Sequence, residues 1–75
     1  MNDFEYQGGD IWSLEEPDAE GYGKTVISFE FDKRNETIWV IDQSRPLDVL
    51  ENHSFVMLLK EIGAGKDWKL ENFTS

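Results

Sequence analysis

An alternation of side chains between Lys24 and Phe31 is the feature that most limits how this chain can fold. Every second residue from Thr25 to Phe31 is Thr, Ile or Phe, and Lys, Val, Ser and Glu occupy the positions between them. In an extended strand these two sets fall on opposite faces. A polar run at 32–35 leads into a second β-rich run at 36–41. Two such runs joined by a short polar turn predict an antiparallel hairpin.

The second run of this hairpin is apolar on both of its faces. Ile38 and Val40 point one way, and Trp39 and Ile41 point the other way. A pattern of this kind is typical of a strand in the interior of a sheet, or of one covered by a partner. We therefore expect a helix to cover one of its faces.

That helix is predicted to follow the hairpin directly. Its start is expected near residues 44–45, because Pro46 suits the first helical position and Asp48 suits the positive end of a helix. The Asn-His-Ser triplet at 52–54 leaves open a division into two helices, and Gly63 predicts the end in either case. The residues expected to face the sheet are Leu47, Leu50, Leu58 and Ile62, with Val49, Phe55, Met57 and Leu59 broadening this stripe.

Weaker strand patterns lie towards the two ends of the chain. Residues 2–14 mix aromatic and apolar residues with acids around a Gly-Gly pair, which predicts two short strands about a turn or bulge. Residues 15–23 contain a proline and two glycines without an apolar period, so we expect an exposed, mobile loop there. Residues 67–73 alternate imperfectly and predict a short final strand.

These elements together predict a small α+β domain. At 75 residues the chain has room for a single domain, residues 1–75. The expected architecture is an antiparallel sheet of about three to five strands with one helix packed on one face. Within it we distinguish an acidic N-terminal segment, 1–23, which we expect to be mobile, from an α+β body, 24–75.

Negative charge is concentrated near the N-terminus. The net charge is −9, and residues 1–20 hold seven carboxylates and no Lys or Arg, which gives this segment a charge of −7. Such a field repels DNA, RNA and anionic membranes, and it speeds encounter with basic surfaces. We therefore expect a basic protein as the partner, with no direct binding of nucleic acid or membrane. The competing interpretation is that the charge serves only solubility.

The residue types that carry most catalytic chemistry are scarce. The chain has no cysteine and a single histidine, His53, which excludes thiolate and multi-histidine metal sites. The sequence Gly23-Lys24-Thr25 ends like a phosphate-binding loop, but position 18 is aspartate where that motif needs its first glycine. We expect no catalytic residues, no metal and no cofactor, and therefore no enzyme.

The function that fits these features best is that of a small acidic inhibitor or modulator, comparable with phage inhibitors, antitoxins and immunity proteins. It would occupy a basic surface with which a partner protein binds nucleic acid. The alternative is a homo-oligomeric structural or accessory module without catalytic activity, in which strand 37–41 or the final strand pairs with another copy. No secretory or transit signal is predicted, so we expect a cytoplasmic location. The residues expected to bind the partner are Asp3, Glu5, Asp10, Trp12, Glu15, Glu16, Asp18, Glu20 and Tyr22.

Overall fold

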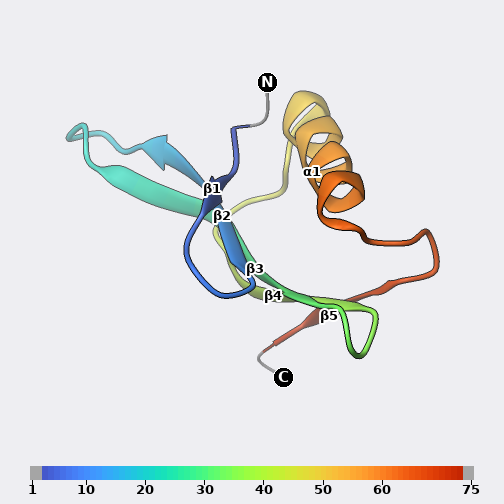
Figure 1. Ribbon diagram of the computed structural model, residues 1–75. Helices are drawn as coiled ribbons and strands as arrows, with labels where there is room; N and C mark the ends of the chain where they lie inside the picture. Colours follow the sequence, from blue (N-terminus) through green and yellow to red (C-terminus); the bar gives the residue numbers. More distant parts are fainter. Residues whose placement is uncertain (1–2, 74–75) are drawn as a thin grey trace.

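The computed structural model describes residues 3–73, which form a five-stranded sheet and a single helix (Figure 1). The elements are β1 (Glu5–Tyr6), β2 (Ile11–Pro17), β3 (Gly23–Asp32), β4 (Thr37–Gln43), α1 (Val49–Ile62) and β5 (Lys69–Asn72). The strands follow one another in sequence order across the sheet, and every neighbouring pair is antiparallel except β4 and β5. Because β4 and β5 are parallel, they need a crossover, which α1 provides. The predicted α+β class is confirmed.

Both predicted hairpins, the one within residues 2–14 and the one at 24–41, are present among residues 3–73. Gly8 and Gly9 have positive φ angles of 98° and 55° in the turn between β1 and β2, a conformation that glycine adopts at little cost. In the turn between β3 and β4, the Asp32 carboxylate accepts hydrogen bonds from the backbone N–H and the side-chain amide of Asn35, at 3.1 and 2.8 Å. The hairpin predicted from the alternation at 24–41 is therefore confirmed.

Strand β2 is longer than the sequence predicts. Residues 15–17, which were expected in a loop, pair with residues 23–25 of β3, so the connecting turn is confined to 18–22. Among residues 3–73, β1 pairs with β2 only at Trp12 and Ser13, so β3 is the strand that neighbours Pro17 in this described part. The loop prediction was wrong at these positions because a proline is tolerated in a strand where one side has no ladder partner.

Two β-bulges interrupt the alternation that the sequence predicts. A register shift between Leu14 and Glu15 leaves Val26 as an extra residue in β3, and a second shift leaves Ile41 as an extra residue in β4. Val26 is fully buried, although strict alternation placed it on the polar face. That placement was wrong because a bulge offsets the side chains that follow it by one position relative to the partner strand.

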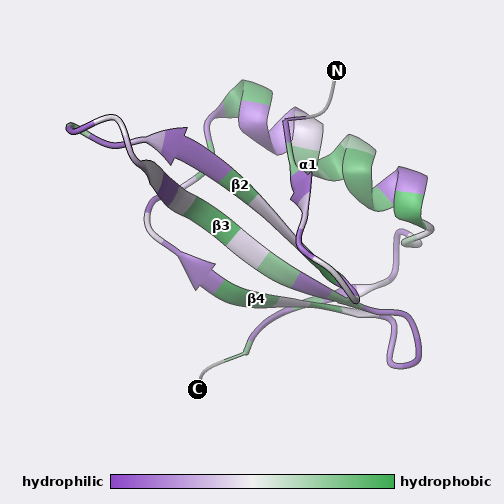
Figure 2. Ribbon diagram, turned by 60° about the vertical axis from the view of Figure 1, so that its left-hand side comes forward, coloured by the Kyte–Doolittle hydropathy of each residue, from purple (hydrophilic) through white to green (hydrophobic). Residues whose placement is uncertain are grey.

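The core lies between the sheet and one side of α1. Phe29 in β3 is fully buried, and its ring meets those of Phe4 and Phe55 edge to face, with centroid distances of 6.0 and 5.2 Å. Figure 2 shows the alternation of hydrophobic and hydrophilic positions along β3 that separates this face from the other one. The buried apolar side chains are Phe4, Leu14, Val26, Ile27, Phe29, Phe31, Ile38, Val40, Phe55 and Leu58.

Helix α1 begins later than expected. Its N-cap is Asp48, whose carboxylate accepts a hydrogen bond from the N–H of Glu51 at 2.8 Å, and the N–H of Asp48 donates to the Glu51 carboxylate at 3.0 Å. The start predicted near 44–45 was wrong because this capping box, three to four residues further along the chain, satisfies the first free N–H groups of the helix. The helix continues through 52–54 and ends at Gly63, whose φ of 103° confirms the predicted stop.

The buried side of α1 is narrower than the predicted stripe. Phe55 and Leu58 are buried, whereas Val49 and Leu50 are 84% and 78% exposed and Met57 is also exposed. The prediction for these three side chains was wrong. At 3.6 residues per turn, a helix that starts at Val49 directs them away from the side that carries Phe55 and Leu58.

Strand β5 confirms the predicted final strand. It pairs in parallel with β4, and the preceding Trp68 stacks on Phe31 with 4.7 Å between ring centroids. Strand β4 thereby has a neighbour on each side. The form of the oligomer hypothesis in which residues 37–41 pair edge to edge with another copy is therefore wrong, and pairing through β5 stays a prediction.

Candidate functional site

The sheet face that points away from α1 gathers aromatic and acidic side chains from several strands. The register aligns Ile11, Glu30, Trp39 and Glu71 in one row across β2, β3, β4 and β5. Residues paired across strands share a face. In β3 and β4 the residues that alternate with this row, Phe29, Phe31, Ile38 and Val40, are buried on the side of α1, so the row lies on the uncovered side (Figure 1). We name this surface the open sheet face. Its members among residues 3–73 are Glu5, Ile11, Ser13, Glu15, Thr25, Ser28, Glu30, Asp32, Thr37, Trp39, Asp42, Lys69, Glu71 and Phe73, of which Ser13 and Thr37 are buried.

Trp39, near the centre of the open sheet face, is held from two sides. Its indole Nε1–H donates to Asp32 Oδ2 at 3.0 Å, and its ring meets that of Phe73 with 6.2 Å between centroids and an interplanar angle of 86°. Hydrogen bonds from Asn35 and then from Trp39 lower the pKa of Asp32, which keeps this carboxylate ionised. Trp39 is half-buried and Phe73 is 60% exposed. Part of an oriented indole thus stays open to solvent.

Two further carboxylates flank Trp39 on the neighbouring strands. Glu30 of β3 and Glu71 of β5 are its direct register partners, so their Cβ atoms lie about 5 Å from that of Trp39. Among residues 3–73, Lys69 is the only basic residue that the register places on this face. An aromatic ring bordered by carboxylates suits a Lys or Arg side chain, which gains both a cation–π contact and charge-assisted hydrogen bonds.

The nine residues predicted to bind a partner are divided between surfaces. Glu5 and Glu15 lie on the open sheet face, as the register partners of Ser13 and Thr25. Trp12 lies on the opposite face, half-buried, with its ring 5.1 Å from the ring of Tyr6. Asp3 is exposed and precedes β1.

Three other predicted residues occupy the turn between β2 and β3. The Asp18 carboxylate accepts hydrogen bonds from the backbone N–H groups of Glu20 and Tyr22, both at 2.9 Å, and so shapes the turn. Glu20 is exposed, and Tyr22 is 70% exposed. Asp10 lies at the other end of β2, about 25 Å from Asp18 at the usual rise of a strand. The structure therefore does not bring these carboxylates together into one surface.

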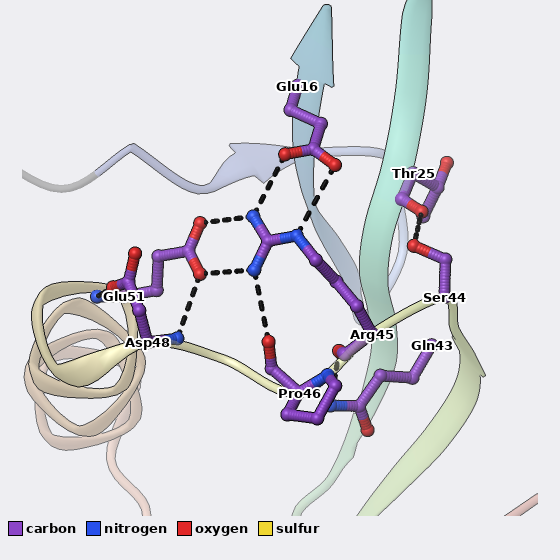
Figure 3. A network of polar contacts seen from close by, with 8 residues as sticks. All are labelled: Glu16, Thr25, Gln43, Ser44, Arg45, Pro46, Asp48 and Glu51. Atoms are coloured by element: carbon purple, nitrogen blue, oxygen red, sulfur yellow. Dashed lines mark hydrogen bonds and ion pairs between the residues drawn. The ribbon is translucent and has the colours of Figure 1, made fainter. Parts of the chain in front are cut away.

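Glu16 is engaged within the chain (Figure 3). Arg45 donates to Glu16 from Nε and Nη2, at 3.3 and 2.9 Å, and to Glu51 from Nη1 and Nη2, both at 2.7 Å. The hydrogen bonds from Arg45 lower the pKa of Glu16; with the added N–H of Asp48, they lower the pKa of Glu51 to about 2. The network joins β2, the β4–α1 connection and the first turn of α1. Glu16 thus helps to position α1 on the sheet.

Sequence reasoning missed the residues at the centre of the open sheet face. The predicted binding residues were those in the segment with the highest density of negative charge along the chain, whereas these residues come from segments of mixed charge. The β3–β4 turn could have revealed part of the group, because strands that end at Asp32 and restart at Thr37 must pair Glu30 with Trp39. The missed residues are Glu30, Asp32, Trp39, Glu71 and Phe73.

Other parts of the surface offer open grooves. One of about 560 Å³ follows the β4–α1 connection from Val40 to Pro46, and an apolar one of about 230 Å³ lies between α1 and the sheet beside Leu47 and Leu70. Within residues 3–73, no three His, Asp or Glu side chains are close enough together to hold a metal ion. The one helix of this described part is too short and too polar to cross a membrane. No protein-family model, curated protein or solved structure matches the chain.

Proposed function

We propose that this protein is a small acidic inhibitor or modulator that places its open sheet face on a basic, nucleic-acid-binding surface of a partner protein. The observation that carries the proposal is the row in which Trp39, oriented by Asp32, lies between Glu30 and Glu71. Tryptophan is a frequent energetic anchor in interfaces because it buries a large, rigid surface. The Arg and Lys side chains of a groove that binds phosphates match the flanking carboxylates.

The charge of the whole chain supports the same role. A net charge of −9 accelerates encounter with a basic surface and slows encounter with nucleic acid or with an anionic membrane. Four of the carboxylates predicted to bind a partner lie outside the open sheet face and contribute only to this long-range electrostatic field: Asp3, Asp10, Asp18 and Glu20. The carboxylates around Trp39 then determine how long the complex lasts, because they are the ones covered in it.

The three tryptophans of the chain provide separate reporters for a binding test. Trp39 is on the open sheet face, and Trp12 and Trp68 pack on the side of α1. Titration of ¹⁵N-labelled protein with an arginine-rich peptide is expected to shift the indole N–H resonance of Trp39 and to leave those of Trp12 and Trp68 nearly unchanged. Shifts at Trp12, or at residues 18–22, without a shift at Trp39 would reject the open sheet face as the binding surface.

A pair of matched double variants separates local contacts from net charge. Glu30→Gln with Glu71→Gln removes two of the three carboxylate charges beside Trp39 and keeps Asp32, which orients the indole, and Glu20→Gln with Glu61→Gln removes two exposed charges elsewhere. The first pair is expected to weaken binding of the peptide about tenfold, chiefly through faster dissociation, and the second less than about threefold, through slower association. Equal losses would mean that only net charge matters. A pulldown from nuclease-treated lysate with the wild type and both double variants then identifies a basic partner whose recovery depends on Glu30 and Glu71.

A further inference from the structure

The outer face of α1, which points away from the sheet, is apolar along much of its length. Four of the eight exposed large hydrophobic side chains found within residues 3–73 are on this one helix: Val49, Leu50, Val56 and Met57. At 3.6 residues per turn they surround His53 and form one stripe. A surface helix normally presents polar residues on this side, so the stripe is suited to contact with a second apolar surface.

The stripe has the same spacing in both directions from His53. Val49 and Met57 lie four residues from it, and Leu50 and Val56 lie three residues from it. In an antiparallel pair of such helices, a two-fold axis at His53 places Val49 against Met57 of the partner subunit and Leu50 against Val56 of the partner subunit. A surface that complements itself in this way is the kind that two-fold dimers use.

The charges around the stripe favour a second copy as its occupant. Most of the surface of a chain with a net charge of −9 repels another copy, but no carboxylate lies on the outer side of α1 between Val49 and Met57. In the antiparallel arrangement, Lys60 in the last turn approaches the N-terminal end of the other helix, where the N-cap residue Asp48 is exposed. Antiparallel packing also places the positive N-terminal end of each helix dipole beside the negative C-terminal end of the other.

We propose that two copies of this chain associate through the outer faces of α1, as an antiparallel helix pair centred on His53. Because α1 covers the other face of the sheet, this arrangement leaves both open sheet faces uncovered, on opposite outer sides of the dimer (Figure 1). One helix pair buries less than the roughly 800 Å² per partner of a standard interface, so the dissociation constant is expected to be on the order of 100 µM.

Disulfide trapping tests the two-fold axis directly. The chain has no cysteine, so His53→Cys introduces a single thiol. In helices packed about 8–10 Å apart, the two Cα atoms at position 53 come within disulfide range. Under mild oxidation at about 100 µM, His53→Cys is expected to form a covalent dimer at least about tenfold faster than Lys33→Cys, an exposed control in the β3–β4 turn. Equal rates for the two variants would overturn the proposal.

Analytical ultracentrifugation with a second matched pair tests the stripe without cysteine. Leu50→Glu adds a charge to the stripe, and Leu70→Glu makes the same change at another exposed leucine, on β5. We expect Leu50→Glu to raise the dimer dissociation constant at least about tenfold and Leu70→Glu to change it less than about threefold. A wild-type chain that stays monomeric up to about 1 mM, or an equal effect of both variants, would refute the helix pair. These outcomes do not depend on whether the open sheet face binds a basic partner.

Discussion

Replacement of Phe29 by leucine should remove a large share of the stability of this fold. Phe29 is fully buried on β3 and meets Phe4 and Phe55 edge to face, at 6.0 and 5.2 Å. Leucine keeps most of the apolar volume, which limits the packing loss to about 1 kcal/mol. It removes both aromatic pairs, each of which contributes about 0.5–1.5 kcal/mol. The free energy of unfolding should therefore fall by about 2–4 kcal/mol, out of roughly 4–11 kcal/mol for a chain of this size.

Urea and thermal unfolding followed by circular dichroism provide the measurement. For a domain of this size, each kcal/mol lowers the unfolding temperature by about 4–8 °C, so Phe29→Leu should lower it by at least about 8 °C. Phe73→Leu is the matched control, because Phe73 is 60% exposed and its one aromatic contact within residues 3–73 is with Trp39. The control should lose less than about 1 kcal/mol.

A double-mutant cycle decides whether the stated contact causes the loss. Combining Phe29→Leu with Phe55→Leu isolates the coupling between β3 and α1, which should be about 0.5–1.5 kcal/mol. A coupling near zero, or equal losses from Phe29→Leu and Phe73→Leu, would refute the packing of α1 on this part of the sheet.

Two further predictions concern the connection that positions α1. Asp48→Ala should cost about 1 kcal/mol in thermal unfolding, whereas Asp48→Asn, which keeps an oxygen acceptor at the N-cap, should cost much less; equal costs would argue against the capping box. Arg45→Met should lower stability at pH 7, and its difference from wild type should shrink between about pH 4.5 and pH 2. The sign follows from the lowered pKa of Glu51, about 2, and of Glu16: their stabilisation is complete above the unfolded pKa and is lost as pH falls through the folded pKa. A difference that does not change with pH, in urea titrations at matched ionic strength, would contradict this role.

The hairpin at 24–41 could be predicted because its information is local. Alternation with period two and a polar turn predict two strands and their pairing. Gly63 likewise predicts the end of α1 from a local signal. The bulge at Val26 could not be predicted from that pattern, since it depends on how β2 pairs with β3. The start of α1 is a different case. Asp48 and Glu51 have the spacing of a capping box in the sequence, and this signal competes with that of Pro46, which indicates an earlier start.

The candidate site was harder to predict than the fold because carboxylates that are neighbours in the sequence are not the ones that are neighbours in the folded structure. The dense run of acids at 1–20 is spread by the sheet over both faces and both ends of β2. Glu30, Trp39 and Glu71 come from three separate strands, and the parallel register of β5 with β4 is needed to bring Glu71 beside Trp39. No property of residues 69–72 alone indicates that register, because β4 and β5 are parallel and joined through the α1 crossover, so their pairing is not local in sequence.

The two proposed surfaces also constrain each other. The open sheet face and the outer face of α1 lie on opposite sides of the molecule, with the core between the sheet and the helix, so a contact at one of them does not cover the other. With α1 paired as proposed, the two open sheet faces point away from each other and cannot both reach one binding groove of a single partner. Dimerisation would then not increase the affinity for one isolated partner molecule, since effective concentration helps only where geometry allows both contacts at once. It would instead join two partner molecules, so a complex at high concentration should contain two copies of each protein.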